Sequence, residues 1–446
     1  MASKTGKTTN KIIKPLTIVL RVIVGVTFIF SGFVKGVDPV GTAMKLQEYF
    51  TGFGIGILSP ASILGKDFVA TLTLTLSVVM AALEFVIGAN ILFGIYRKTS
   101  SWLLLLFMLV MTPLTFYLAL ANPVHDCGCF GDALVISNWE TFYKNLVLLA
   151  AALFLLKYNN DYNGIYPRPI RWIPLVYSII FVTGISVISL LHQPFFDFRP
   201  YKSGTDIRTM LNAEKVQPEY LFVYEKGGVK KEFTLDNYPA SDTSWHFVDR
   251  VEKFPAGKDI APIDFIVRDN DDDVTDWILN DTTYTFLLFV PSMDGYDDSW
   301  QEKINELYDY AYENSYNFYC LSPDAEEWRH RIEESGISYP CYTMDQTTIE
   351  TIVRGNPAVA LMKDGVLYWK CNPRDLPDMG QISEPLDKNS VGQIHVYNFW
   401  HRVLFLSVIY TVPLLVLYLA GQGAVALIAK VRRKRRELEK REEDNK

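Results

Sequence analysis

Residues 102–121 read WLLLLFMLVMTPLTFYLALA, a stretch without a single charged side chain. A run of about 20 apolar residues is long enough to cross the roughly 30 Å hydrocarbon layer of a membrane as an α-helix. Comparable runs occur elsewhere in the 446 residues, at Leu16–Val34, Ala70–Ile95, Phe142–Leu156, Trp172–Leu191 and Val403–Ala429. The sequence therefore predicts six membrane-spanning helices.

The basic residues beside these runs indicate how the chain crosses the membrane. Lysine and arginine gather before the first run, between the second and third, between the fourth and fifth, and after the last. Cytoplasmic flanks are enriched in these residues, whereas the alternate connections and the long segment His192–Trp400 lack this enrichment. We expect an inner-membrane protein with both termini in the cytoplasm and the long segment in the periplasm.

Charge also separates the chain into two parts and excludes one class of partner. His192–Trp400 carries 19 basic and 37 acidic residues, a net charge of −18, while the rest of the chain carries +11. The only dense basic run is the short C-terminal tail, so we do not expect nucleic acid as a partner. The expected partner of the apolar runs is the lipid bilayer.

These patterns divide the chain into five segments. We expect a four-helix membrane domain at 1–157, a cytoplasmic loop with the fifth helix at 158–191, and a periplasmic connector at 192–258. An α/β domain follows at 259–378, and the sixth helix with its basic tail occupies 379–446. Within the connector, 220–235 is typical of a β-hairpin that turns at Gly227-Gly228, and 239–243 is the best candidate for a hinge.

Two cysteines lie between the third and fourth predicted helices, in Asn122-Pro-Val-His-Asp-Cys-Gly-Cys-Phe-Gly-Asp132. In an oxidising compartment, Cys127 and Cys129 are a candidate redox pair, because a Cys-x-Cys disulfide closes a small strained ring that is easier to reduce. The neighbouring Asp126 would raise a thiol pKa by charge repulsion, whereas protonated His125 would lower it. A structural disulfide and a metal site formed with His125 remain alternatives, although the ligands lack the usual zinc spacing.

Two charged residues fall inside or at the end of predicted helices. Glu84 lies in the middle of the second helix, where a bare carboxylate is expensive, so we expect it to face the bundle. Lys35 lies at the outer end of the first helix, where it can extend towards the membrane surface or form an ion pair. For both residues a structural role competes with a functional one.

Three motifs together resemble the DoxX superfamily, and within it the MauE-like branch. They are FIFSGFVKGVDP at Phe28–Pro39, LEFVIG at Leu83–Gly88 and DCGCFGD at Asp126–Asp132. The resemblance covers about residues 12–157 and implies a four-helix membrane bundle linked to respiratory or disulfide redox chemistry. In some members it implies neighbouring quinone-linked enzymes, and in the MauE branch the maturation of disulfide-rich periplasmic proteins. The full length resembles long DoxX-family membrane proteins of Bacteroidota-type bacteria.

The segment 259–378 alternates predicted strands and helices, which favours an α/β layer, and it resembles a thioredoxin-like domain. Pro357 matches the position of that fold's cis-proline. The dithiol of such a domain would follow the strand ending at Pro291, where this chain has SMDGYDD and no cysteine. Of the remaining cysteines, Cys320 and Cys371 are expected to be buried, and Cys341 to be the more exposed. Asn356, Pro357 and Cys341 are the candidate partner-binding residues.

The fold class expected is thus an α-helical membrane bundle, DoxX-like with two further spans, joined to a soluble thioredoxin-like domain. The leading functional hypothesis is electron exchange between Cys127–Cys129 and a periplasmic thiol protein or membrane redox partner. The sequence requires no metal and no cofactor, and a quinone is the acceptor that the resemblance suggests. The alternative is a non-enzymatic assembly or scaffold protein whose Cys-Gly-Cys is a structural disulfide and whose thioredoxin-like domain recruits partners.

Overall fold

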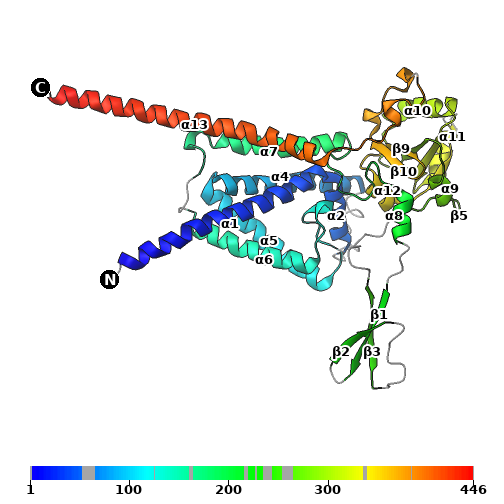
Figure 1. The fold of residues 1–446 in the computed structure, drawn as a ribbon, viewed down its shortest axis with the longest axis horizontal. Coiled ribbons are helices and arrows are strands. Elements are labelled where there is room, and N and C mark those ends of the chain that lie inside the picture. The colour runs from blue at the N-terminus through cyan, green and yellow to red at the C-terminus, as the bar shows by residue number, and fades with distance from the viewer. Residues whose placement is uncertain are drawn as a thin grey trace. The chain divides into compact units, whose positions relative to one another are not determined.

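The computed structural model describes residues 3–444 except 53–65, 125, 160–163, 215–218, 227–228, 235–243, 254–264, 335–338 and 383. The chain forms two compact units (Figure 1). The helical unit comprises Met1–Arg199 and Tyr397–Lys446, and the sheet unit comprises Pro200–Val396. The expected hinge at 239–243 lies outside the described residues.

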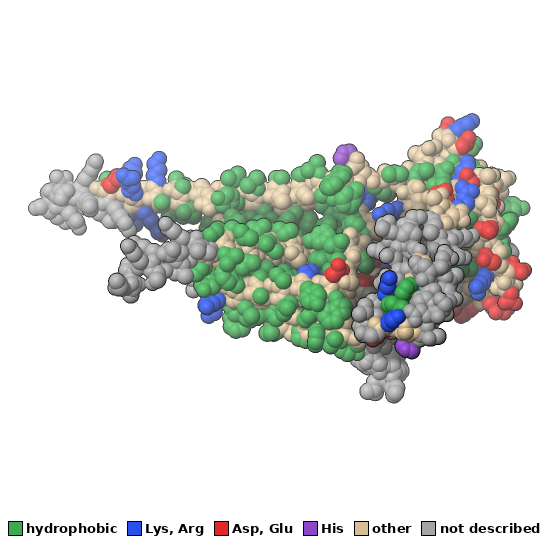
Figure 2. Space-filling model, turned by 60° about the horizontal axis from the view of Figure 1, so that its bottom comes forward, with side chains coloured by type: hydrophobic (Ala, Val, Ile, Leu, Met, Phe, Trp, Pro, Cys, Tyr) green, Lys and Arg blue, Asp and Glu red, His purple; other side chains and the backbone are tan. Residues whose placement is uncertain are grey.

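Within the described residues, the helical unit contains six helices long and apolar enough to cross a membrane. They are α1 (Ser3–Val37), α4 (Lys66–Phe93), α5 (Arg97–Ala121), α6 (Asn138–Lys157), α7 (Trp172–Leu191) and α13 (Phe399–Asp444). Five of the six predicted runs fall within them, and the run Ala70–Ile95 extends two residues beyond the end of α4, so a multi-pass membrane protein is confirmed. Figure 2 shows one face of this unit largely covered by apolar side chains, as contact with lipid requires.

Close packing of α1 against α4 forms the centre of the helical unit. A Cβ atom built on Gly32 would lie 2.4 Å from the Phe85 nitrogen, and one on Gly88 would lie 2.6 Å from the Ile29 nitrogen. Without side chains at these positions the two backbones approach closely, as small residues permit in membrane helices. Beside this contact, apolar side chains of α1, α4, α5 and α6 form one buried cluster that includes Phe28, Ile91 and Met108.

The short helix α2 (Pro39–Gly52) follows α1 after one non-helical residue, Asp38, whose carboxylate accepts a hydrogen bond from the Gly41 N–H at 2.9 Å. It packs on the first half of α4, where the Gln47 amide donates to the Thr73 hydroxyl at 3.1 Å. The helix α6 begins with a capping box formed by Ser137 and Glu140, which satisfies N–H groups at its first turn.

The sheet unit contains a seven-stranded mixed sheet with the order β10-β9-β6-β7-β8-β4-β5. Strands β6 (Thr285–Phe289), β7 (Asn317–Ser322) and β8 (Cys341–Thr343) are parallel, and β9 (Ala358–Lys363) is antiparallel to β6. The other strands are β4 (Arg268–Asp269), β5 (Asp272–Asp273) and β10 (Val366–Cys371). The Asn356–Pro357 peptide bond, just before β9, is cis.

Helices cover both faces of this sheet. On one face, α10 (Gln301–Glu313) and α11 (Ala325–Glu334) pack on Phe286 and Leu288. On the other, α8 (Ile207–Glu214), α9 (Thr275–Leu279) and α12 (Gln346–Ile352) pack around Leu287 and Phe289. Alternate residues of β6 thus enter opposite cores, as the two-residue period of a strand dictates.

A separate antiparallel sheet, with the order β2-β1-β3, is formed by β1 (Glu219–Lys226), β2 (Val229–Phe233) and β3 (His246–Lys253). The first two strands occupy the segment expected to form a hairpin. Short 3-10 helices complete the described elements, at Gly131–Ala133, Arg168–Ile170, Asp298–Trp300, Pro373–Asp375, Met379–Gln381 and Ser390–Gly392.

Candidate functional site: the cysteine loop

The cysteine loop, residues 122–137, connects α5 to α6 and is anchored where it leaves α5. Asn122 adopts a left-handed conformation with φ of 44° and closes α5 through its N–H to the Leu118 carbonyl. The side-chain amide of Asn138, the first residue of α6, donates to the Asn122 side chain and to the Val124 carbonyl, both at 2.9 Å. The two ends of the loop are therefore tied to each other.

A tight turn brings the two sulfur atoms together. Gly128 has a φ of 61°, a conformation that glycine adopts without the steric cost of a side chain. Its N–H donates to the Asp126 carboxylate at 2.8 Å, and its carbonyl accepts from the Gly131 N–H at 3.1 Å. The Sγ atoms of Cys127 and Cys129, both half-buried, lie 3.1 Å apart. This geometry places the thiols where one can donate a hydrogen bond to the other.

The helix α2 holds one side of the loop. Lys45 Nζ lies 2.9 Å from Asp126 Oδ1 and 2.8 Å from Glu48 Oε2, and the Tyr49 hydroxyl donates to the Cys127 carbonyl. Lys45 and Tyr49 are four residues apart, so they share one face of the helix. Burial works against the Lys45 ammonium, but the two carboxylates outweigh it and raise the pKa of Lys45.

The other side of the loop is held by a buried ion pair. Lys35 Nζ lies 2.9 Å from Glu84 Oε2, and only 5% and 4% of the two side chains are exposed. The same ammonium donates to the Ser31 hydroxyl at 2.8 Å and to the Cys129 carbonyl at 2.6 Å. The Ser31 hydroxyl also donates to this carbonyl, at 2.7 Å. The peptide beside the second thiol is thereby fixed to α1.

The two thiols differ in acidity. The hydrogen bond from the Cys127 thiol favours the thiolate of Cys129, as do the positive charges of Lys144 and Lys35, and the pKa of Cys129 falls to about 6 despite its burial and Glu84. The same hydrogen bond and burial raise the pKa of Cys127. The directions of these shifts make Cys129 the more acidic of the two thiols.

Of the site residues that the sequence indicated, five come together here: Cys127, Cys129, Asp126, Lys35 and Glu84. His125 lies outside the described residues. The sequence prediction did not include three residues around the loop, Lys45, Tyr49 and Lys144. The four-residue spacing of Lys45 and Tyr49 indicates that they share a helix face but not that this face meets the loop. Lys144 reaches the loop by lying 4.2 Å above the Phe130 ring.

The remaining predicted site residues belong to the sheet unit. The Asn356 side-chain amide donates to the Ser292 carbonyl at 2.7 Å, so Asn356 and Pro357 lie beside the segment that follows β6. The expectation that Cys341 is the exposed thiol is wrong, because its exposed fraction is 2%. It lies on β8 directly opposite Cys320 of β7, within the core.

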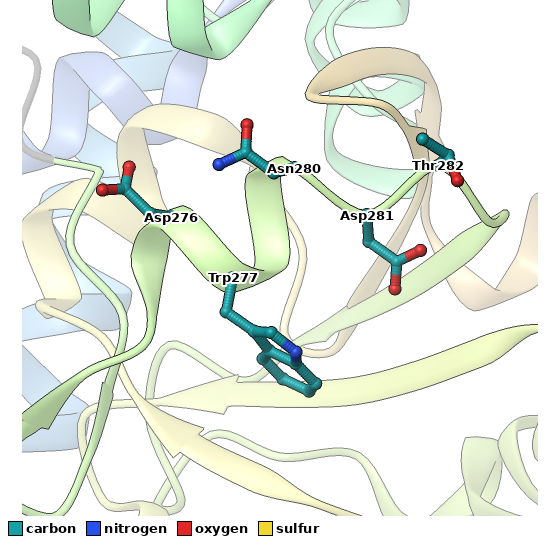
Figure 3. A pocket seen from close by; sticks show the side chains of 5 residues that line it. All are labelled: Asp276, Trp277, Asn280, Asp281 and Thr282. Atoms are coloured by element: carbon teal, nitrogen blue, oxygen red, sulfur yellow. The ribbon is translucent and has the colours of Figure 1, made fainter.

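A shallow hollow in the sheet unit is lined by Asp276, Trp277, Asn280, Asp281 and Thr282 (Figure 3). The Trp277 ring lies 5.4 Å from the Tyr319 ring. The Asp281 carboxylate is already engaged by the Thr283 N–H and the Asn317 amide. This hollow contains no thiol, and no group of three or more metal-binding side chains is found among the residues that the structure describes.

Two family models match this chain, one in the helical unit and one in the sheet unit. A family model described as "Methylamine utilisation protein MauE" matches residues 13–158, which include most of α1, all of α4, α5 and α6, and the cysteine loop. A second, described as "Domain of unknown function (DUF8463)", matches residues 218–254, the three-stranded sheet. No curated protein and no solved structure matches the chain. The first third of this membrane protein is thus similar to MauE, which confirms that part of the resemblance.

Proposed function

We propose that this protein is a membrane-embedded thiol–disulfide exchange protein in which Cys127 and Cys129 exchange electrons with a thiol protein outside the cytoplasm. The observation that carries the proposal is the 3.1 Å separation of the two sulfurs in a loop held by α1 and α2. A pair that must alternate between disulfide and dithiol needs both sulfurs within bonding reach in either state. The charge pattern of the spans favours the periplasmic side of an inner membrane for this loop.

The proposed step is an exchange of disulfides. A thiolate of the partner attacks one sulfur of the oxidised Cys127–Cys129 pair, the S–S bond breaks, and a mixed disulfide forms while the other cysteine leaves as a thiolate. The second partner thiolate then attacks the mixed disulfide, so the partner becomes oxidised and the pair receives two electrons. The partner's two protons pass to the pair or to solvent. The bilayer gives the reduced pair access to a quinone, a lipid-soluble two-electron acceptor that would restore the disulfide.

The sheet unit supports a role in holding the partner. In the order β10-β9-β6-β7, β6 and β7 are parallel and β9 is antiparallel to both of its neighbours, which fits the proposed thioredoxin-like domain. The segment Ser292–Asp298, which would carry the dithiol of such a domain, contains no cysteine. A domain that keeps the fold without the thiols can bind a partner and leave the chemistry to the cysteine loop.

One observation favours the alternative of an assembly or scaffold protein. The contacts of Lys35, Lys45 and Tyr49 fix the loop from two helices, as they would fix a structural staple. Under this alternative, the Cys127–Cys129 disulfide stays closed and the sheet unit recruits partners.

Trapping of mixed disulfides separates the two functions. We expect Cys127→Ser or Cys129→Ser, quenched with acid in cells, to carry a disulfide-linked protein that is absent from the double serine variant. Cys371→Ser is the matched control and should trap nothing. A pair that stays oxidised in strongly reducing buffer, with no adduct in either single variant, would establish the staple instead.

A further inference from the structure

The ion pair of Lys35 and Glu84 links α1 to α4, and its ammonium group also binds the cysteine loop. An ammonium group has three N–H donors. Those of Lys35 have three acceptors within hydrogen-bond distance: Glu84 Oε2, the Ser31 hydroxyl and the Cys129 carbonyl. Burying two charges costs free energy before their attraction is counted, and apolar residues could link the helices without that cost.

Among the described residues, the titratable groups around the two thiols belong to four helices and to the loop itself. Lys35 belongs to α1, Lys45, Glu48 and Tyr49 to α2, Glu84 to α4, Lys144 to α6, and Asp126 to the loop itself. Lys45 is shared between two carboxylates, whereas Lys35 faces one. Lys35 therefore contacts the Cys129 peptide directly. A single carboxylate, that of Glu84, balances its positive charge.

We propose that the Lys35–Glu84 pair sets the proton count of the redox reaction: Lys35 keeps Cys129 as a thiolate after reduction, so the cysteine pair takes up two electrons but one proton near neutral pH. This inference rests on the proposed redox function and deepens it. Lys35 and Glu84 act as positioning residues, since the reacting atoms are the sulfurs. Of the two protons that leave the partner's thiols, one is bound by Cys127 and the other goes to solvent.

The acidity of the thiols agrees with this role. The hydrogen bond from Cys127 lowers the pKa of Cys129 most, and the charges of Lys144 and Lys35 lower it further, while burial and Glu84 raise it. The two members of the ion pair therefore act on the thiolate in opposite directions. A purely structural ion pair would behave differently, because loss of either member would disturb the loop in the same way.

The test measures the reduction potential of the cysteine pair against pH in the full-length protein, by equilibration with a dithiol buffer and counting of alkylated Cys127 and Cys129. Uptake of two protons changes the equilibrium constant hundredfold per pH unit, about 59 mV, and uptake of one proton changes it tenfold, about 30 mV. The slope of the wild type should change near pH 6, where the Cys129 thiolate forms.

Four variants make the test specific. Lys35→Met should move the change of slope to higher pH by about one unit, as expected for loss of a nearby opposite charge. Glu84→Gln, which keeps an acceptor for Lys35, should move it to lower pH. Lys35→Arg keeps the positive charge and should leave the change of slope at the wild-type pH. Lys157→Met, on α6 and over the Tyr158 ring, is the control that should not move the change of slope.

Each outcome decides the proposal. Shifts of opposite sign in Lys35→Met and Glu84→Gln support it, whereas shifts of the same sign, or none, overturn it and leave the pair a structural link. If Lys35→Met does not fold, Lys35→Met/Glu84→Gln, which removes both charges of the pair, should show a smaller upward shift, because Lys35 affects Cys129 more strongly than Glu84 does. No shift or a downward shift in the double variant would overturn the proposal. A wild-type pair that does not cycle at all refutes the proposed redox function, which is a different result from a pair that cycles without these shifts.

Discussion

The carbonyl oxygen of Cys129 accepts hydrogen bonds from both Lys35 and Ser31, so this peptide joins the cysteine loop to the first span. Hydrogen bonds from a charged donor are roughly twice as strong as neutral ones. On the other side, the Cys127 carbonyl accepts from Tyr49. Both peptides are thus held while the sulfurs face each other, and the acidity of one thiol depends on the hydrogen bond from the other.

Replacement of Cys127 should reveal that dependence. In Cys127→Ala the donor to Cys129 is lost, so the pKa of Cys129 should rise from about 6. A rise of about two units would lower the thiolate fraction at pH 7, and with it the rate of alkylation, by about tenfold. Cys127→Ser keeps a hydroxyl donor and should stay closer to the acidity of the reduced wild type. The measurement is the rate of iodoacetamide modification of Cys129 between pH 5 and 9. Equal rates in the two variants would contradict the shared proton.

The sequence revealed the members of this site one by one but not their contacts. Glu84 and Lys35 were singled out because a charge in an apolar helix is expensive, yet they are 49 residues apart and nothing local indicates that they pair. Lys45 and Tyr49 lie on a short helix whose polar residues look like an ordinary solvated face. Only the packing of α2 beside the loop shows that they hold it.

Among the elements, the α1–α4 contact depends most sharply on individual residues. A Cβ on Gly32 would meet backbone atoms of α4, the Ala81 oxygen at 2.6 Å and the Phe85 nitrogen at 2.4 Å. Backbone atoms of a helix cannot move out of the way by changing a rotamer, as a flexible side chain can. The helices would have to separate, and the Lys35–Glu84 pair lies in the same interface.

Gly32→Ala should therefore destabilise the helical unit, by about 1–3 kcal/mol, the usual cost of overpacking. Gly184→Ala on α7 is the matched control, since a Cβ there meets nothing within 4 Å and alanine favours a helix over glycine. Thermal unfolding in detergent would compare the two. A Gly32→Ala protein as stable as Gly184→Ala would show that α1 and α4 are not in this close contact.

Elements were predicted unevenly, and the reasons are physical. The six spans follow from apolar length, since a bilayer requires about 20 such residues whatever their neighbours. The burial of Cys341 was not predictable in this way, because β8 has three residues and its core position follows from pairing with Cys320 on β7. A pattern of alternation cannot be recognised over so short a strand.

At the scale of the whole molecule, the charges of the two parts imply one orientation. The acidic segment His192–Trp400 lies between spans α7 and α13, and the basic residues lie at the opposite ends of those spans. A reporter active only in the cytoplasm should give no signal when fused at position 300 and a strong one when fused after Lys446. A strong signal at position 300 would overturn the proposed topology.

The sheet unit should carry no thiol chemistry of its own. Its three cysteines are Cys320 and Cys341, both buried, and Cys371, whose pKa is raised to about 12 by burial and by Asp375. Burial shields Cys320 and Cys341 from reagents, and because the thiolate is the reactive form, the raised pKa should keep Cys371 inert near pH 7. A fragment of residues 200–396, which has its own two cores, should fold, resist alkylation until denatured, and fail to reduce an insulin disulfide. Turnover that disappears in Cys320→Ser or Cys371→Ser would place the active thiols here and not in the cysteine loop.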